Sequence, residues 1–103
     1  MAGNYTLTPK DMGHRVIQAI VLEPWRILLR LDPGGWRVLD CQPFFKGPAL
    51  AQLADPIVFA KANIASNTIT WPDEMAIDPD VAYWDSEPAE DFFARANHEV
   101  FGE

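Results

Sequence analysis

One four-residue segment constrains this chain more than any other. Asp32-Pro33-Gly34-Gly35 separates two short runs in which apolar and polar residues alternate, from Trp25 to Leu31 and from Trp36 to Asp40. Proline presets φ for a tight turn, and glycine accepts the positive φ that such turns require. The alternation places Ile27, Leu29 and Leu31 on one face of the first run. The segment therefore predicts an antiparallel β-hairpin.

The remaining patterns place further short elements around this hairpin. Arg15 to Leu22 is rich in β-branched residues and largely apolar on both faces, which predicts a strand that is central in its sheet or covered on each side. Short strands are expected at 61–64 and 68–71, and helical turns at 49–53, at 56–60 after Asp55, and from Asp78 through Tyr83. A helix with an apolar stripe is expected from about Pro88 to Val100, capped by Ser86.

These elements predict an α+β fold, with a mainly antiparallel sheet of four to five short strands and a C-terminal helix on one face. Residues 1–14 are expected to form a loose N-terminal arm, because glycine, proline and asparagine interrupt any regular pattern there. Residues 15–85 would form a single α+β domain. Residues 86–103 would form the helix that packs on it.

Composition and charge exclude several classes of protein. Apolar residues make up 49% of the 103 residues, which excludes disorder from lack of hydrophobic content, and one cysteine excludes a disulfide framework. No apolar run approaches the roughly 20 residues that span a bilayer, so we expect a cytoplasmic protein without membrane contact. The charge balance is +2 up to Pro72 and −9 from Asp73 onward. This field disfavours direct nucleic-acid binding. It fits either docking of the acidic segment on a basic partner or an acidic surface that only maintains solubility.

Three segments resemble the small bacterial proteins grouped as domain of unknown function 2442. They are the hairpin from Ile27 to Asp40, the segment Leu53-Ala54-Asp55-Pro56-Ile57-Val58-Phe59, and the stretch in which Trp71-Pro72-Asp73 precedes Asp78-Pro79-Asp80. The resemblance covers about residues 15 to 85 and implies a compact α+β domain without an assigned activity. Two departures are Glu74, where the family often has glycine, and Ala76, where it often has aspartate. If that aspartate is functional in relatives, this chain lacks it.

The side chains that could bind a metal or act in catalysis are expected to have structural roles. Carboxylates are densest between Asp73 and Asp85, but the segment lacks the glycine and alternating ligands of a calcium loop, and Asp78 and Asp80 are expected to cap a helix or close a turn. His14 and His98 are expected on the surface. Cys41 is expected to be half-buried and structural, because no neighbouring base would lower its pKa. We predict no catalytic residue, no metal ligand and no cofactor.

These observations favour a non-enzymatic protein-interaction or regulatory module with a protein partner or a homodimer. The alternative is a small-ligand-binding protein or minor enzyme that uses the acidic loop 71–85. Three of the four tryptophans are expected in the core, whereas an exposed one in this loop would suit a binding hot spot. Under either hypothesis, the candidate binding residues are Trp71, Asp73, Asp78, Asp80, Tyr83 and Trp84.

Overall fold

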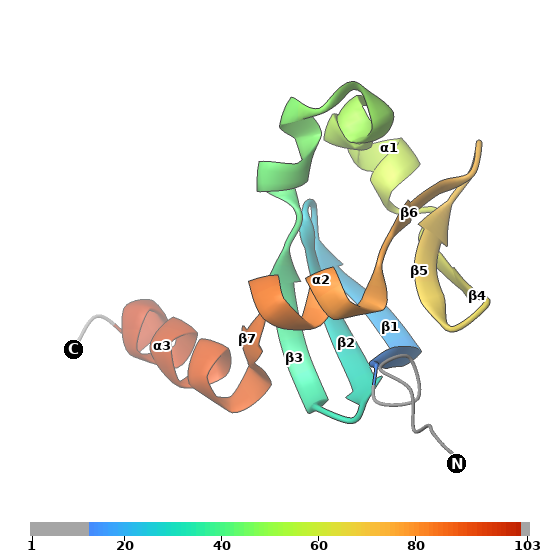
Figure 1. The fold of residues 1–103 in the computed structure, drawn as a ribbon. Helices are drawn as coiled ribbons and strands as arrows, with labels where there is room; N and C mark the ends of the chain where they lie inside the picture. Colours follow the sequence, from blue (N-terminus) through green and yellow to red (C-terminus); the bar gives the residue numbers. More distant parts are fainter. Residues whose placement is uncertain (1–12, 102–103) are drawn as a thin grey trace, which may run out of the picture.

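The predicted hairpin lies at the centre of a four-stranded antiparallel sheet. In the computed structural model, which describes residues 13–101, β1 (Arg15–Glu23), β2 (Arg26–Asp32), β3 (Gly35–Asp40) and the short β7 (Glu87–Pro88) follow the order β1-β2-β3-β7 (Figure 1). Leu28 pairs with Val38, and Leu31 pairs with Gly35 next to the turn. The α+β fold class is confirmed, and the predicted N-terminal arm lies outside the described residues except for its last two positions.

The other strands form a second, three-stranded sheet. It consists of β4 (Asn63–Ala65), β5 (Thr68–Trp71) and β6 (Met75–Ile77), so the strands are divided between two sheets. The turn between β5 and β6 holds Asp73 and Glu74 at φ of 65° and 64°. Such left-handed pairs usually contain glycine or asparagine. Because this turn contains neither glycine nor asparagine, the sequence pattern does not predict β6.

The helical segments are short except for the last one. Two 3₁₀ segments (Gln42–Lys46 and Pro48–Ala54) precede α1 (Pro56–Phe59), and α2 (Pro79–Asp85) and α3 (Ala89–Phe101) follow the second sheet. The predicted cap at Asp55 is confirmed, since its carboxylate accepts a hydrogen bond of 2.9 Å from the Ile57 amide. Ser86, expected to cap α3, instead ends α2. No helix within residues 13–101 has the length and apolar character needed to cross a membrane.

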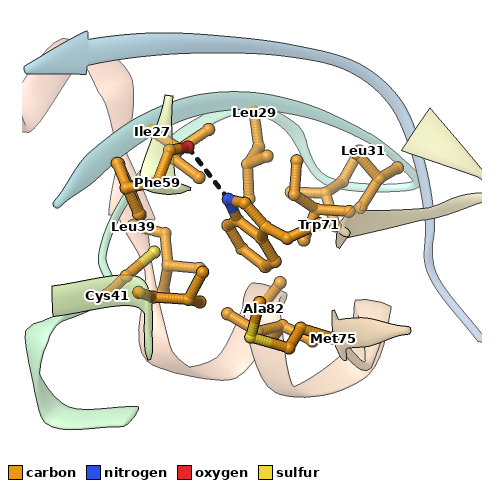
Figure 2. Close-up of a cluster of buried hydrophobic side chains, with 13 residues drawn as sticks. Ile27, Leu29, Leu31, Leu39, Cys41, Phe59, Trp71, Met75 and Ala82 are labelled. Carbon is orange, nitrogen blue, oxygen red and sulfur yellow. Dashed lines mark hydrogen bonds between the residues drawn. The ribbon is translucent and has the colours of Figure 1, made fainter. Parts of the chain in front are cut away.

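One hydrophobic core lies between the two sheets. Its members come from the inner face of the four-stranded sheet, from Cys41 after β3, from the second 3₁₀ segment, from α1 and α2, and from β5 and β6, and nine of them are labelled in Figure 2. The Trp71 indole stacks near Phe59 at 5.8 Å between ring centroids, and its Nε1 donates a hydrogen bond of 2.9 Å to the Phe59 carbonyl. The polar atom of the largest core side chain therefore has a buried partner.

Strand β1 differs from the prediction. It is the edge of its sheet and is not covered on both sides, because Ile17 and Ile20 are 39% and 49% exposed. Its register with β2 shifts between Val16 and Gln18, which shows a bulge at Ile17. A bulge adds one residue and reverses the face on which later side chains lie. Val16, Ala19 and Val21 consequently all face the core, which simple alternation does not predict.

Helix α3 packs against the four-stranded sheet at its β3 and β7 end. Figure 1 shows it beside these strands and away from the second sheet. The Arg26 guanidinium lies 5.5 Å from the centre of the Phe92 ring, and Val38 is only 4% exposed. Because Arg26 and Val38 point away from the core, α3 covers part of the outer face of this sheet.

Candidate functional site on helix α2

Helix α2 is held on the domain by its underside. Its N-terminus is capped by Asp78, whose carboxylate accepts a hydrogen bond of 2.8 Å from the Asp80 amide. Ala82, on the opposite side from Trp84 by helical spacing, is completely buried in the core. The capping role predicted for Asp78 is confirmed. The exposed face of α2, with Asp80, Trp84 and Asp85, is named here the α2 surface.

A histidine far away in sequence anchors the first turn of α2. The His14 backbone N–H donates to Oδ1 of Asp80 at 2.9 Å, and the His14 Nδ1 lies 2.9 Å from the same oxygen. A carboxylate can only accept, so we assign the Nδ1 proton to this bond. The backbone bond, followed by the ring bond, holds the pKa of Asp80 below its usual value. The prediction of a surface His14 is wrong, since only 16% of its side chain is exposed.

The Tyr83 ring contacts the imidazole of His14 and the guanidinium of Arg37. The His14 ring stacks on it at 4.0 Å between centroids and 16° between planes, and the Arg37 guanidinium lies 4.3 Å from its centre. Gly34 in the hairpin turn, at φ of 127°, approaches the same ring so closely that a Cβ there would lie 3.0 Å from two ring carbons. The predicted hairpin thus also provides the space in which Tyr83 packs.

The end of α2 is fixed to β3 by a pair of hydrogen bonds. Arg37 Nε donates to the Ser86 hydroxyl at 2.7 Å, and Arg37 Nη2 donates to the Ser86 carbonyl at 2.8 Å. The Ser86 hydroxyl in turn donates to the Tyr83 carbonyl at 2.9 Å. The first turn of α2 is therefore held by His14, the residue before β1, and its end is held by Arg37 of β3.

The tryptophan on this helix is open to solvent. Trp84 is 70% exposed, and it follows Asp80 by one helical turn, so the two side chains share a face. Asp85 is also exposed. From Asp73 to Ala94 the sequence contains eight acidic residues and neither lysine nor arginine. The α2 surface combines one large aromatic side chain with the carboxylates of Asp80 and Asp85, within an acidic stretch of the sequence.

The six predicted binding residues do not form one site. Trp71 lies in the core at 4% exposure, and Asp73 lies in the exposed turn between β5 and β6. Asp78, Asp80, Tyr83 and Trp84 all belong to α2 or its cap. Within this set the structure brings Asp80, Tyr83 and Trp84 together and places the two tryptophans in different environments.

His14 and Arg37 complete the site, and the sequence pattern does not predict them as part of it. Asp80 and His14 are 66 positions apart, and Arg37 and Ser86 are 49 apart. The sequence signal for Arg37 is the alternation in its strand, which places it on the same side as Leu39. In the structure this side faces the core, where an unpaired cation would be costly.

Metal and thiol chemistry find little support here. In the described part of the chain, no three or more histidine, cysteine or acidic side chains gather as they would around a metal ion. Cys41 is fully buried, and burial, with a smaller effect from the charge of Asp40, raises the pKa of its thiol to about 12. A thiol with this pKa is a weak nucleophile at neutral pH.

Comparisons of the chain with protein-family models, with curated proteins and with solved structures found no match. The resemblance to domain of unknown function 2442 accordingly remains an expectation.

Proposed function

We propose that this protein is a non-enzymatic protein-interaction module that binds a basic partner protein through the α2 surface. The observation that carries this proposal is the 70% exposure of Trp84 on a helix that hydrogen bonds hold at both ends. Tryptophan is among the residues most enriched at the centres of protein interfaces. A single aromatic anchor of this kind fills an apolar pocket on its partner.

The rigidity of α2 supports the proposal energetically. Binding is weakened when a flexible segment has to be ordered, and a fixed segment avoids that cost. His14, Arg37 and Ser86 fix α2 before any partner arrives. The Trp84 side chain is thus presented from a constant position.

The charge around Trp84 indicates what kind of partner fits. Asp80, Asp85 and the acidic residues on either side of α2 give a negative surface, and complementary charge accelerates association and excludes other acidic proteins. A partner with lysine and arginine side chains around an apolar pocket matches this surface. Its binding would weaken as salt concentration increases.

The test compares two equally exposed apolar residues. The wild-type chain is used to capture partners from native cell extract, and the affinity of the stoichiometric partner is then measured for Trp84→Ala and Ile57→Ala. Ile57 on α1 is 71% exposed and serves as the matched control. Loss of a hot spot costs about 2 kcal/mol or more, so we expect Trp84→Ala to weaken binding about 30-fold. Ile57→Ala should retain wild-type affinity.

Two results would contradict the proposal. One is the absence of any stoichiometric partner at physiological salt. The other is a partner whose affinity is unchanged by Trp84→Ala while Ile57→Ala weakens it.

A second candidate function is binding of a small ligand, or minor acid–base chemistry, at the acidic loop 71–85. The observation in its favour is the His14–Asp80 pair, because a carboxylate that orients an imidazole is one part of many general-base arrangements. A thermal-shift screen with divalent metals and metabolites tests it. Stabilisation of the wild type that is lost in Asp80→Asn would support this function, and no stabilisation by any compound would rule it out.

A further inference from the structure

The outer face of the four-stranded sheet is covered on one half only. This face points away from the core, and the strand registers place six of its residues in two neighbouring cross-strand rows: Ile20, Leu28 and Val38 in one, and Gln18, Arg30 and Trp36 in the other. Helix α3 lies over β7 and over the end of β3 away from the hairpin turn, where Val38 is 4% exposed and Arg26 of β2 lies 5.5 Å from the Phe92 ring centre. On the rest of the face Ile20 is 49% exposed and Trp36 is 40% exposed.

Arg30 brings a positive charge to this uncovered half. Its side chain is exposed, and within the described residues its hydrogen bond is to the neutral amide oxygen of Gln18, at 3.2 Å. Leu28 lies two residues before it on the same side of β2. An incoming surface that matches this half would offer an apolar side chain for Ile20 and Leu28 and an acidic one for Arg30.

Helix α3 offers that combination on the side turned away from its own sheet. Phe92 faces the sheet, whereas Phe93 is 39% exposed. Glu90 precedes Phe93 by three residues, so the two side chains lie on the same side of the helix, and Glu90 is exposed. The exposed side of α3 is therefore complementary, in polarity and in charge, to the uncovered half of the sheet.

We propose that two copies of this chain form a two-fold symmetric dimer in which each α3 covers the uncovered half of the other copy's sheet. The partner's Phe93 contacts Ile20 and Leu28, and the partner's Glu90 pairs with Arg30. The same contacts occur twice, as the symmetry of such an interface requires. This proposal is independent of the one for α2, because it uses no residue of the α2 surface.

A charge-swap experiment tests the pairing directly. Arg30→Glu places two acidic side chains opposite each other at both contacts, and Glu90→Arg places two basic side chains there. Each variant alone should therefore dimerise at least tenfold more weakly than the wild type, measured by sedimentation equilibrium.

An equimolar mixture of the two variants should recover the dimer. When one copy of each variant associates, the two substituted side chains meet at one contact with opposite charges. The other contact is the native pair of Arg30 and Glu90. The mixture should therefore dimerise within about threefold of the wild type.

Lys61→Glu provides the matched control. It makes the same change of charge as Arg30→Glu, at an exposed position outside the four-stranded sheet. Its dimerisation should equal that of the wild type. Circular dichroism of each variant, and the restoration seen in the mixture, separate loss of dimerisation from loss of folding.

Three results would overturn the proposal. The first is a wild-type chain that stays monomeric up to millimolar concentration. The second is a dimer that neither Arg30→Glu nor Glu90→Arg weakens. The third is a mixture that dimerises no better than the single variants although both are folded.

Discussion

Trp71 and Trp84 begin and end the same acidic stretch of the sequence, yet they lie in opposite environments. Trp71 is 4% exposed, stacks on Phe59 and donates a hydrogen bond to its carbonyl, whereas Trp84 is 70% exposed on α2. The difference follows from their positions. The former ends a strand of the three-stranded sheet that faces the core, and the latter lies on the side of a helix opposite its buried alanine. One segment thus contributes a buried tryptophan to the core and an exposed tryptophan to the surface.

The largest effect should come from truncating each tryptophan in turn. Trp71→Ala removes a buried ring and should lower the free energy of unfolding by about 3–5 kcal/mol. Trp84→Ala removes an exposed one and should change it by less than about 0.5 kcal/mol. Urea denaturation of both variants checks this. Equal losses of unfolding free energy in the two variants would contradict the difference in burial between Trp71 and Trp84.

A smaller effect is expected at the hairpin turn under Tyr83. Gly34→Ala forces a Cβ against the Tyr83 ring at a φ of 127°, and should destabilise the fold by about 2–3 kcal/mol. Gly35 also has positive φ, at 72°, but no heavy atom would lie within 4 Å of its added Cβ. Gly35→Ala should therefore cost only about 1 kcal/mol. If the two alanine variants have the same stability, Tyr83 is not packed on the turn.

The cap of α2 should contribute less again. Asp78→Ala removes the acceptor for the Asp80 amide and should cost about 1 kcal/mol. Asp55→Ala at α1 removes the same type of bond and gives the comparison value. Hydrogen exchange should show faster opening of α2 amides in Asp78→Ala and unchanged exchange in β5, where Trp71 lies. Faster exchange in both regions would mean that α2 and the core open together.

The smallest effect concerns pH. The pKa of Asp80 is lowered in the folded chain, so its contribution to stability is present above the pKa of the unfolded chain and is lost as pH falls below about 4. Asp80→Asn should therefore show a shallower loss of stability than the wild type as the solution is acidified through this range. Thermal denaturation at a series of pH values measures the difference. A steeper loss in Asp80→Asn would contradict the His14 contact.

The sequence predicts the parts of this fold that depend on neighbouring residues. The hairpin around Asp32-Pro33-Gly34-Gly35 and the caps at Asp55 and Asp78 follow from local turn and capping chemistry, and the structure confirms them. Strand β6 escapes prediction because its turn uses Asp73 and Glu74 instead of glycine. Turn and capping residues do not predict a strand where a bulge, or a residue unusual for its turn, determines the backbone geometry.

The candidate site is predicted only in part, for a different reason. The sequence points to Asp80, Tyr83 and Trp84, but their supports at His14 and Arg37 lie far away in the chain, and no periodicity connects positions so far apart. The burial of Trp71 depends likewise on how the second sheet folds over the first. Long-range packing determines these features, and it is not encoded in any local pattern.

Three consecutive residues, the one before β1 and the first two of β1, each contact a different distant part of the chain. His14 contacts Asp80, Arg15 pairs with Asp32, and the amide of the fully buried Val16 donates to the Asn67 carbonyl at 2.8 Å. Trimming the chain to start at Ile17 would remove all three contacts at once. Any shortened version or fusion junction should therefore keep His14, Arg15 and Val16.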